Sequence, residues 1–164
     1  METLVPIIMG SRSDMEHAQK IEEALEQFSI DCELRIGSAH KTPEHILKMI
    51  QAYEADPRPK VYITIAGRSN ALSAFVDGSV SAPVIACPPV SNSFGGADIF
   101  SSLRMPGGVA PAVVLDPAGA ALLAAKILSL VDPVIGERVA ALQKTNKDTI
   151  MQDDTEIQKT KDKS

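Results

Sequence analysis

The stretch CELRIGSAHKTP, residues 32–43, decides the fold class of this 164-residue chain. Its first five residues alternate between apolar and polar, as in a β-strand, and Thr42 followed by Pro43 predicts a helix N-cap and first helical residue. His40 then falls in the loop between a strand and a helix, where open parallel sheets bind ligands. Taken alone, a loop histidine is more often just a solvated side chain. The other loops of the chain are needed to choose between these interpretations.

Composition and charge exclude several classes of partner. Lys and Arg number 16 against 21 Asp and Glu, so the net charge of −5 offers no electrostatic footprint for nucleic acid or an anionic membrane. Apolar residues make up 45% of the chain and aromatic residues 4%, which is typical of a globular protein with one core. Basic residues that bind a ligand must therefore be few and local.

The two cysteines and the N-terminus indicate the compartment. Cys32 and Cys87 stand apart, without a C-x-x-C spacing or a histidine close in sequence, so we expect no zinc or other metal site and no disulfide framework. The N-terminus lacks the basic region of a signal peptide, and no apolar run approaches the roughly 20 residues of a membrane span. We expect a reduced, cytoplasmic protein with no membrane partner.

Apolar runs alternate with helical patterns along the chain, which indicates βα units and a parallel sheet. The predicted strands cover residues 4–9, 32–36, 61–65, 83–87 and 112–115. The first predicted helix has Ser13 as N-cap, with Glu16 completing a capping box. Further helices are predicted over residues 43–54, 70–80, 97–104, 117–131 and 134–150. The sequence itself does not fix the order of the strands in the sheet.

These elements predict a three-layer α/β/α sandwich with a flavodoxin-like parallel sheet and a C-terminal helical extension. We expect residues 1–150 to form one domain and residues 151–164 to form a charged tail that frays. The helix at 117–131 is apolar around most of its circumference, which indicates cover on more than one side. A monomer would expose that helix, so a homo-oligomer is expected.

Four successive predicted strands end in polar loops, and parallel strands bring these ends to one edge of the sheet. The loops are residues 10–14, 37–41, 66–70 and 88–96. The first loop resembles a cradle for a phosphate or hydroxyl, because Gly10 permits close approach, Ser11 offers a hydroxyl and a helix N-terminus follows. Ser13 is better explained as an N-cap, whereas Asp14 suits both the helix dipole and hydrogen bonds from a ribose.

The remaining loops add cations and small polar groups. Lys41 and Arg68 could each attract an anionic ligand, although isolated cations are also common on solvated surfaces. Ser69 and Asn70 suit either a ligand contact or a helix cap. The fourth loop combines small polar residues with one aromatic, Phe94, which is typical of a mobile cover over a site.

The other two histidines, His17 and His45, are expected to have structural or solvated roles, because they border the apolar stripes of their helices. What the residues predict is a small phosphorylated ligand at the sheet edge, with His40 as acid or base. The residues alone do not identify the substrate.

Three motifs in these loops and one later motif also resemble those of a known family. They read G-S-x-S-D after the first strand, S-A-H-K-T-P after the second, A-G-R-S-N after the third and S-S-L-R-M-P at residues 101–106. The chain resembles a PurE-type phosphoribosylaminoimidazole carboxylase of purine biosynthesis over residues 4–150. Lys41 and the sequence Arg68-Ser69-Asn70 resemble the second class of that family, which carboxylates aminoimidazole ribonucleotide directly with carbon dioxide. Ala74 and Gly107 stand where the second class is expected to have Gly and Ser. Neither is a motif position that bears the chemistry.

The resemblance implies a role for each candidate residue and no cofactor. His40 would move the proton at ring carbon C4, Ser11 and Asp14 would hold phosphate and ribose, and Ser38 and Lys41 would line the ribonucleotide site. Gly67, Ser69 and Asn70 would face the imidazole and carbon dioxide. The family's homo-octamers would explain the apolar helix at 117–131. The alternatives are the first class, a mutase acting on N5-carboxyaminoimidazole ribonucleotide, and a non-catalytic nucleotide-binding module.

Overall fold

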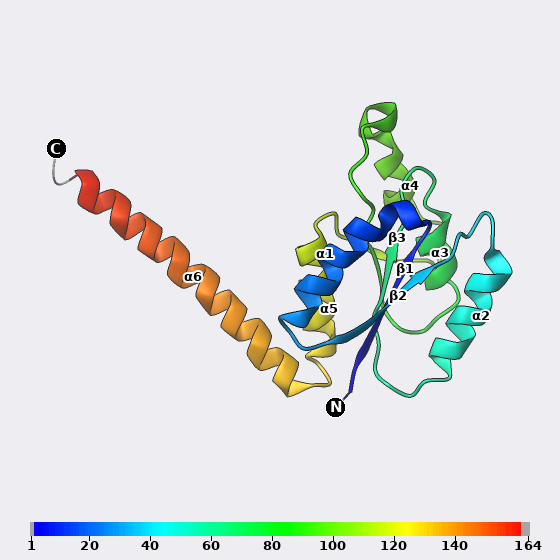
Figure 1. The fold of residues 1–164 in the computed structure, drawn as a ribbon, viewed down its shortest axis with the longest axis horizontal. Helices are drawn as coiled ribbons and strands as arrows, with labels where there is room; N and C mark the ends of the chain where they lie inside the picture. Colours follow the sequence, from blue (N-terminus) through cyan, green and yellow to red (C-terminus); the bar gives the residue numbers. More distant parts are fainter. Residues whose placement is uncertain (1, 162–164) are drawn as a thin grey trace.

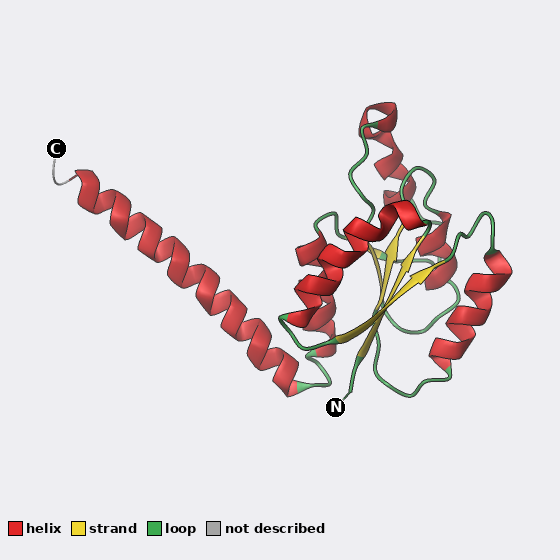
Figure 2. Ribbon diagram, in the orientation of Figure 1, coloured by secondary structure: helices red, strands yellow, loops and turns green. Residues whose placement is uncertain are grey.

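The computed structural model describes residues 2–161 and contains a twisted parallel sheet covered by helices on both faces (Figures 1 and 2). The strands are β1 (Leu4–Met9), β2 (Asp31–Ile36), β3 (Tyr62–Ile65), β4 (Val84–Ala86) and β5 (Ala112–Val113). The α-helices are α1 (Met15–Glu26), α2 (Pro43–Glu54), α3 (Ala71–Asp77), α4 (Phe100–Leu103), α5 (Pro117–Leu128) and α6 (Pro133–Lys161). Two 3-10 helices, η1 (Arg12–Asp14) and η2 (Ser93–Ile99), precede α1 and α4.

The sheet has the strand order β2-β1-β3-β4-β5, and every pairing is parallel. This is the flavodoxin-like order, so the predicted fold class is confirmed. The direction in which successive strands are added to the sheet reverses between β1 and β3, because β2 lies on one side of β1 and the later strands lie on the other. In such sheets the crevice beyond the carboxyl ends of the strands at this switch point binds the ligand.

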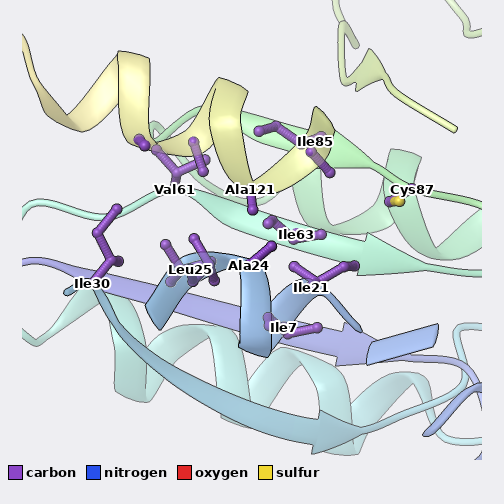
Figure 3. Close-up of a cluster of buried hydrophobic side chains, with 14 of the residues drawn as sticks. Ile7, Ile21, Ala24, Leu25, Ile30, Val61, Ile63, Ile85, Cys87 and Ala121 are labelled. Carbon is purple, nitrogen blue, oxygen red and sulfur yellow. The ribbon is translucent and has the colours of Figure 1, made fainter. Parts of the chain in front are cut away.

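The core is divided by the sheet into two apolar layers, because alternate residues of a strand face opposite sides. Ile7 of β1 and Ile63 of β3 pack with Ile21 and Leu25 of α1 and with Ala121 of α5 (Figure 3). The opposite layer joins the strands to α2 and α3, and its buried members include Leu4, Ile8, Ile46, Ile50, Tyr62, Leu72 and Val76. Both faces of β1, β3 and β4 are thus buried, as expected for a parallel sheet, whereas the residues of the edge strands β2 and β5 are exposed or half-buried.

A close approach of α2 to the end of β2 sets the position of the histidine loop. A Cβ atom built on Gly37 would lie 2.7 Å from Cγ1 of the fully buried Ile46, so only glycine allows this packing. The Thr42 hydroxyl accepts a hydrogen bond from the Ser38 amide at 3.0 Å and lies 3.3 Å from the Ser38 carbonyl oxygen. Thr42 is the N-cap residue, as predicted, but its side chain forms no capping hydrogen bond to α2. The side chain instead closes the turn over residues 38–42.

The start of the first helix differs from the prediction. Residues 12–14 form η1, and Ser11 is the N-cap residue of this turn instead of Ser13. The Asp14 carboxylate accepts from the Ser11 amide at 3.2 Å and from the Ser11 hydroxyl at 3.3 Å. A capping box is therefore present, but it is shifted by two residues, because the chain tightens into a 3-10 turn before α1 begins.

The C-terminal segment also differs from the prediction, since α6 continues to Lys161 instead of ending near Ile150. All residues from 143 to 160 are exposed, and the helix projects away from the sheet (Figure 1). Side-chain pairs four residues apart support it, including Lys144 with Asp148 and Gln152 with Glu156. The predicted charged tail is thus helical in its described part, and residues 162–164 lie outside the described residues.

The apolar helix α5 is covered largely within the chain. Its buried residues Ala121 and Ala125 belong to the cluster that contains α1, and Ile135 and Val139 at the start of α6 join the same cluster. The expectation of cover on more than one side is confirmed, but α1, the sheet and α6 supply that cover. Within residues 2–161, no helix combines the length and apolarity needed to cross a membrane.

Candidate active site

A cavity of about 550 Å³ lies at the carboxyl edge of the sheet, where the switch point predicts a ligand site. Residues from the loops after β1, β2, β3 and β4 line it. These are Gly10, Ser11, Ser13, Asp14, Ser38, Ala39, His40, Lys41, Ala66, Gly67, Arg68, Ser69, Leu72, Pro89, Ser91 and Asp98. All predicted site residues except Asn70 are therefore brought together in one cavity.

The second loop presents His40 and Lys41 from a turn closed on itself. The amides of Lys41 and Thr42 donate to the Ser38 carbonyl oxygen at 3.2 and 2.8 Å. His40 is exposed, and its side chain forms no hydrogen bond with the described residues. Its imidazole is free to exchange a proton with a ligand in the cavity.

Charges of both signs line the cavity. The exposed cations Lys41 and Arg68 offer N–H donors to an anionic group, and the guanidinium can bind a phosphate in a bidentate manner. Asp14 and Asp98 are the anionic groups of the lining, and their carboxylates can accept hydrogen bonds from hydroxyl or amine groups. A ligand with a phosphate at one end and hydroxyl and amine donors elsewhere matches this set of charges.

Asn70 does not line the cavity, which corrects the expectation that it faces the ligand. It is 4% exposed, and its side-chain oxygen accepts from the amide and hydroxyl of Ser73 at 3.1 and 2.9 Å. Its side-chain nitrogen donates to the Ser102 hydroxyl at 2.9 Å. Both ends of the amide are thus engaged, so Asn70 caps α3, the alternative that the sequence left open.

Asp98 lines the cavity but was missed by the sequence analysis, whereas Ser91, which also lines it, belongs to the polar fourth loop. Asp98 accepts a hydrogen bond from the Arg68 amide at 3.1 Å, across thirty residues of sequence. The sequence placed Asp98 in the helix predicted over residues 97–104, and nothing in the pattern indicated a contact with the third loop. In the structure, η2 contains left-handed residues at Phe94, Gly95 and Gly96 that turn the chain back toward the sheet.

His17 of α1 joins the first helix to the end of β4. Its Nε2 lies 3.1 Å from the Cys87 carbonyl oxygen and 3.3 Å from Cys87 Sγ. Because a carbonyl only accepts, Nε2 carries the proton in this bond. Burial lowers the pKa of His17 and raises the pKa of the Cys87 thiol to about 12. The structural role expected for His17 is confirmed, and its partner is a cysteine seventy residues away.

The lowered pKa of His17 predicts a pH dependence of stability. The unfolded chain takes up a proton at this histidine more readily than the folded chain, so the free energy of unfolding falls as pH drops through about 6.5. His17 is half exposed, so we expect the loss to stay below the roughly 1.4 kcal/mol of one pKa unit. Urea unfolding of wild type and His17→Gln between pH 8 and 5 measures it.

The glutamine amide can still donate to the Cys87 carbonyl, but it does not titrate, so this variant should lose less stability at pH 5 than the wild type. His45→Gln is the matched control, because His45 is exposed on α2. It should keep the wild-type pH dependence. Equal pH dependence in wild type and His17→Gln would contradict the prediction.

Within residues 2–161, no group of three or more His, Cys, Asp or Glu side chains is arranged to hold a metal ion.

The fold and the cavity define an α/β protein that binds a small polar ligand at the carboxyl edge of a parallel sheet. A family model for AIR carboxylase matches residues 4–149. The chain therefore belongs to the AIR carboxylase family.

Similar proteins agree with that assignment. The chain is 57% identical over 159 residues to the phosphoribosylaminoimidazole carboxylase of Treponema denticola, covering 97% of this chain and 100% of that protein. It is 52% identical over 151 residues to that of Archaeoglobus fulgidus, covering 92% and 83%. The crystal structure of Treponema denticola PurE superposes with a TM-score of 0.93 at 58% identity, covering 94% of this chain and 98% of that one. The resemblance is confirmed, and the protein is a phosphoribosylaminoimidazole carboxylase of purine biosynthesis.

Proposed function

We propose that this enzyme carboxylates 5-aminoimidazole ribonucleotide directly and reversibly with carbon dioxide, giving 4-carboxy-5-aminoimidazole ribonucleotide. The observation that carries the proposal is the presence of His40 and Lys41 in the same cavity as the serine loop after β1 and the Gly67–Ser69 turn after β3. One cavity thus contains an imidazole, which can accept or donate a proton, together with two cations and several hydroxyl groups. The names of the relatives support the substrate class.

The aminoimidazole ring is an enamine, so its electrons can form the new bond from C4 to carbon dioxide without activation by biotin. This step leaves C4 tetrahedral, with both its original hydrogen and the new carboxylate. His40 then accepts the C4 proton, the C–H electron pair returns to the ring, and aromaticity is restored. In the reverse direction the protonated side chain of His40 returns the proton to C4 of the substrate, and the C–C bond breaks to release carbon dioxide.

The other residues bind and orient the ribonucleotide. We assign Ser11 and Asp14 to phosphate and ribose, and Ser38 and Lys41 to the ribonucleotide more generally. Gly67 and Ser69 face the imidazole and carbon dioxide, which has no net charge and is held by shape and N–H donors. Asn70 takes part through its hydrogen bonds beneath this loop instead of by direct contact.

Comparing two substrates tests this proposal against its alternatives. We expect product from aminoimidazole ribonucleotide at a rate that rises with dissolved carbon dioxide, followed by absorbance, without ATP, biotin or added metal. A chelator should leave the rate unchanged. The N5-carboxylated isomer should be a poor substrate, because the third loop carries Arg68, Ser69 and Asn70 in place of the first-class residues.

Rapid conversion of the isomer while carbon dioxide is scavenged would identify a mutase instead. Binding of the ribonucleotide without turnover of either substrate would favour a nucleotide-binding module.

We also propose that the enzyme works as a homo-oligomer, an octamer by family resemblance, in the cytoplasm. Large apolar side chains are exposed on the arm formed by η2 and α4 and its preceding loop, namely Val90, Phe94, Phe100 and Leu103. Ile150, Met151 and Ile157 are exposed on α6. Exposed apolar groups of this size typically mark protein interfaces.

A further inference from the structure

The end of η2 and the helix α4 support the third loop of the active site from behind. We call Asp98, Ser101 and Ser102 the brace, because each forms a hydrogen bond with the loop at residues 68–70. Ser101 and Ser102 belong to α4, and Asp98 lies in η2, in the segment that follows β4. The brace therefore joins two site loops that are about thirty residues apart in sequence.

Arg68, at the centre of the third loop, has an unusual backbone. Its φ is +55°, in the left-handed region that favours glycine, so surrounding contacts must hold a side-chain-bearing residue there. Those contacts are present on both sides of the residue. The Arg68 amide donates to Asp98 Oδ2 at 3.1 Å, and the Arg68 carbonyl oxygen accepts from the Ser101 hydroxyl at 2.8 Å.

Ser101 is the centre of this arrangement. Its hydroxyl lies 2.8 Å from the carbonyl oxygens of both Arg68 and Asp98, and it accepts a hydrogen bond from the Asn70 amide at 3.0 Å. A hydroxyl has one proton, so it donates to one carbonyl at a time while accepting from the amide. The single side chain thus fixes the loop on both sides of Ser69.

A buried polar chain continues the support into the sheet. Ser102 accepts from the Asn70 side chain, Asn70 accepts from Ser73, and the Ser73 hydroxyl lies 2.7 Å from Thr64 Oγ1 of β3. Asn70, Ser73, Ser102 and Thr64 are all buried. Hydrogen bonds in a low-dielectric interior are strong, and an unpaired member would be costly, so the loop is held at a defined position.

We propose that Asp98 and Ser101 are positioning residues for the carboxylation, because they hold Arg68 in the left-handed conformation and so set Gly67 and Ser69 against the imidazole and carbon dioxide. This inference rests on the proposed function for what the loop faces, but the bracing itself is a property of the fold. A displacement of about 1 Å in an active-site group can cost on the order of 100-fold in rate. Loss of the brace therefore lowers turnover more than affinity.

The experiment compares Ser101→Ala with Ser79→Ala. Ser79 is the matched control, because its exposed hydroxyl bonds to the Phe75 carbonyl at the end of α3, outside the cavity. We expect amide hydrogen exchange over residues 67–70 to quicken at least about tenfold in Ser101→Ala and to stay unchanged in Ser79→Ala. With aminoimidazole ribonucleotide and carbon dioxide, Ser101→Ala should lower kcat about 10- to 100-fold with KM changed less than about threefold.

A double-substitution cycle tests the strain separately. Glycine adopts a positive φ without cost, so Ser101→Ala should lower Tm less in an Arg68→Gly background than in the wild type. Equal Tm losses in the two backgrounds, or unchanged exchange at residues 67–70 in Ser101→Ala, would overturn the inference. A wild-type enzyme that fails to carboxylate the ribonucleotide would instead refute the proposed function, and the exchange and Tm measurements would still test the brace.

Discussion

Replacing His40 with asparagine is expected to lower turnover at least about 100-fold, the low end for general acid–base catalysis. Asparagine keeps a similar shape and can form hydrogen bonds, but it cannot accept the C4 proton. The fold should survive, because the His40 side chain is exposed and forms no hydrogen bond with the described residues. Steady-state rates with aminoimidazole ribonucleotide and carbon dioxide measure the effect.

Binding of the ribonucleotide by His40→Asn should stay within a few-fold of wild type, as measured by calorimetry, because the phosphate and ribose contacts are proposed to lie on other loops. His45→Asn is the matched control, since His45 is another exposed histidine of the same segment and is not among the cavity residues. It should turn over at the wild-type rate. Near-native turnover in His40→Asn would show that another group moves the proton.

Light scattering at micromolar concentration is expected to give a mass several times the 17.5 kDa of one chain. The physical reason is the large exposed apolar surface on the arm and on α6, where Phe94 is 88% exposed and Ile150 69% exposed. Most of the stability of a helix in a protein comes from packing, so contact with a second chain would stabilise the exposed stretch from 143 to 160.

Charged substitutions on the arm test the surface directly. Phe94→Asp combined with Phe100→Asp should lower the mass toward that of a smaller species, because burying two carboxylates without partners is costly. Substituting the exposed Lys126 of α5 by Ala is the control and should leave the mass unchanged. A single species of monomer mass for the wild type would refute the oligomer.

The strands and most of the site could be predicted because their signals are local. The alternation after Cys32 and the Thr42-Pro43 pair gave a strand, a loop and a helix in the correct order, and α2 begins and ends at the predicted residues. The rule that parallel strand ends share an edge then placed His40, Lys41 and Ser69 in one cavity. Their catalytic and binding roles stay predictions.

Two expectations differed from the structure, one because the partner of a residue is remote in sequence and one because local charge pairs were not weighed. Asn70 fitted both a cap and a ligand contact, and burial against α4 favoured the cap. The helix at the C-terminus was expected to fray because of its charge, but pairs four residues apart support it in the structure. Neither outcome follows from composition.

The sequence by itself determined the βα alternation, the four motifs and the family, because these depend on residue type and on spacings of a few positions. Only the tertiary structure decided the strand order, the partner of His17 and the contact of Asp98 with the Arg68 backbone. Hydrogen bonds across thirty or seventy residues leave no periodic signal, since they depend on how crossovers bring separate loops to the same edge of the sheet.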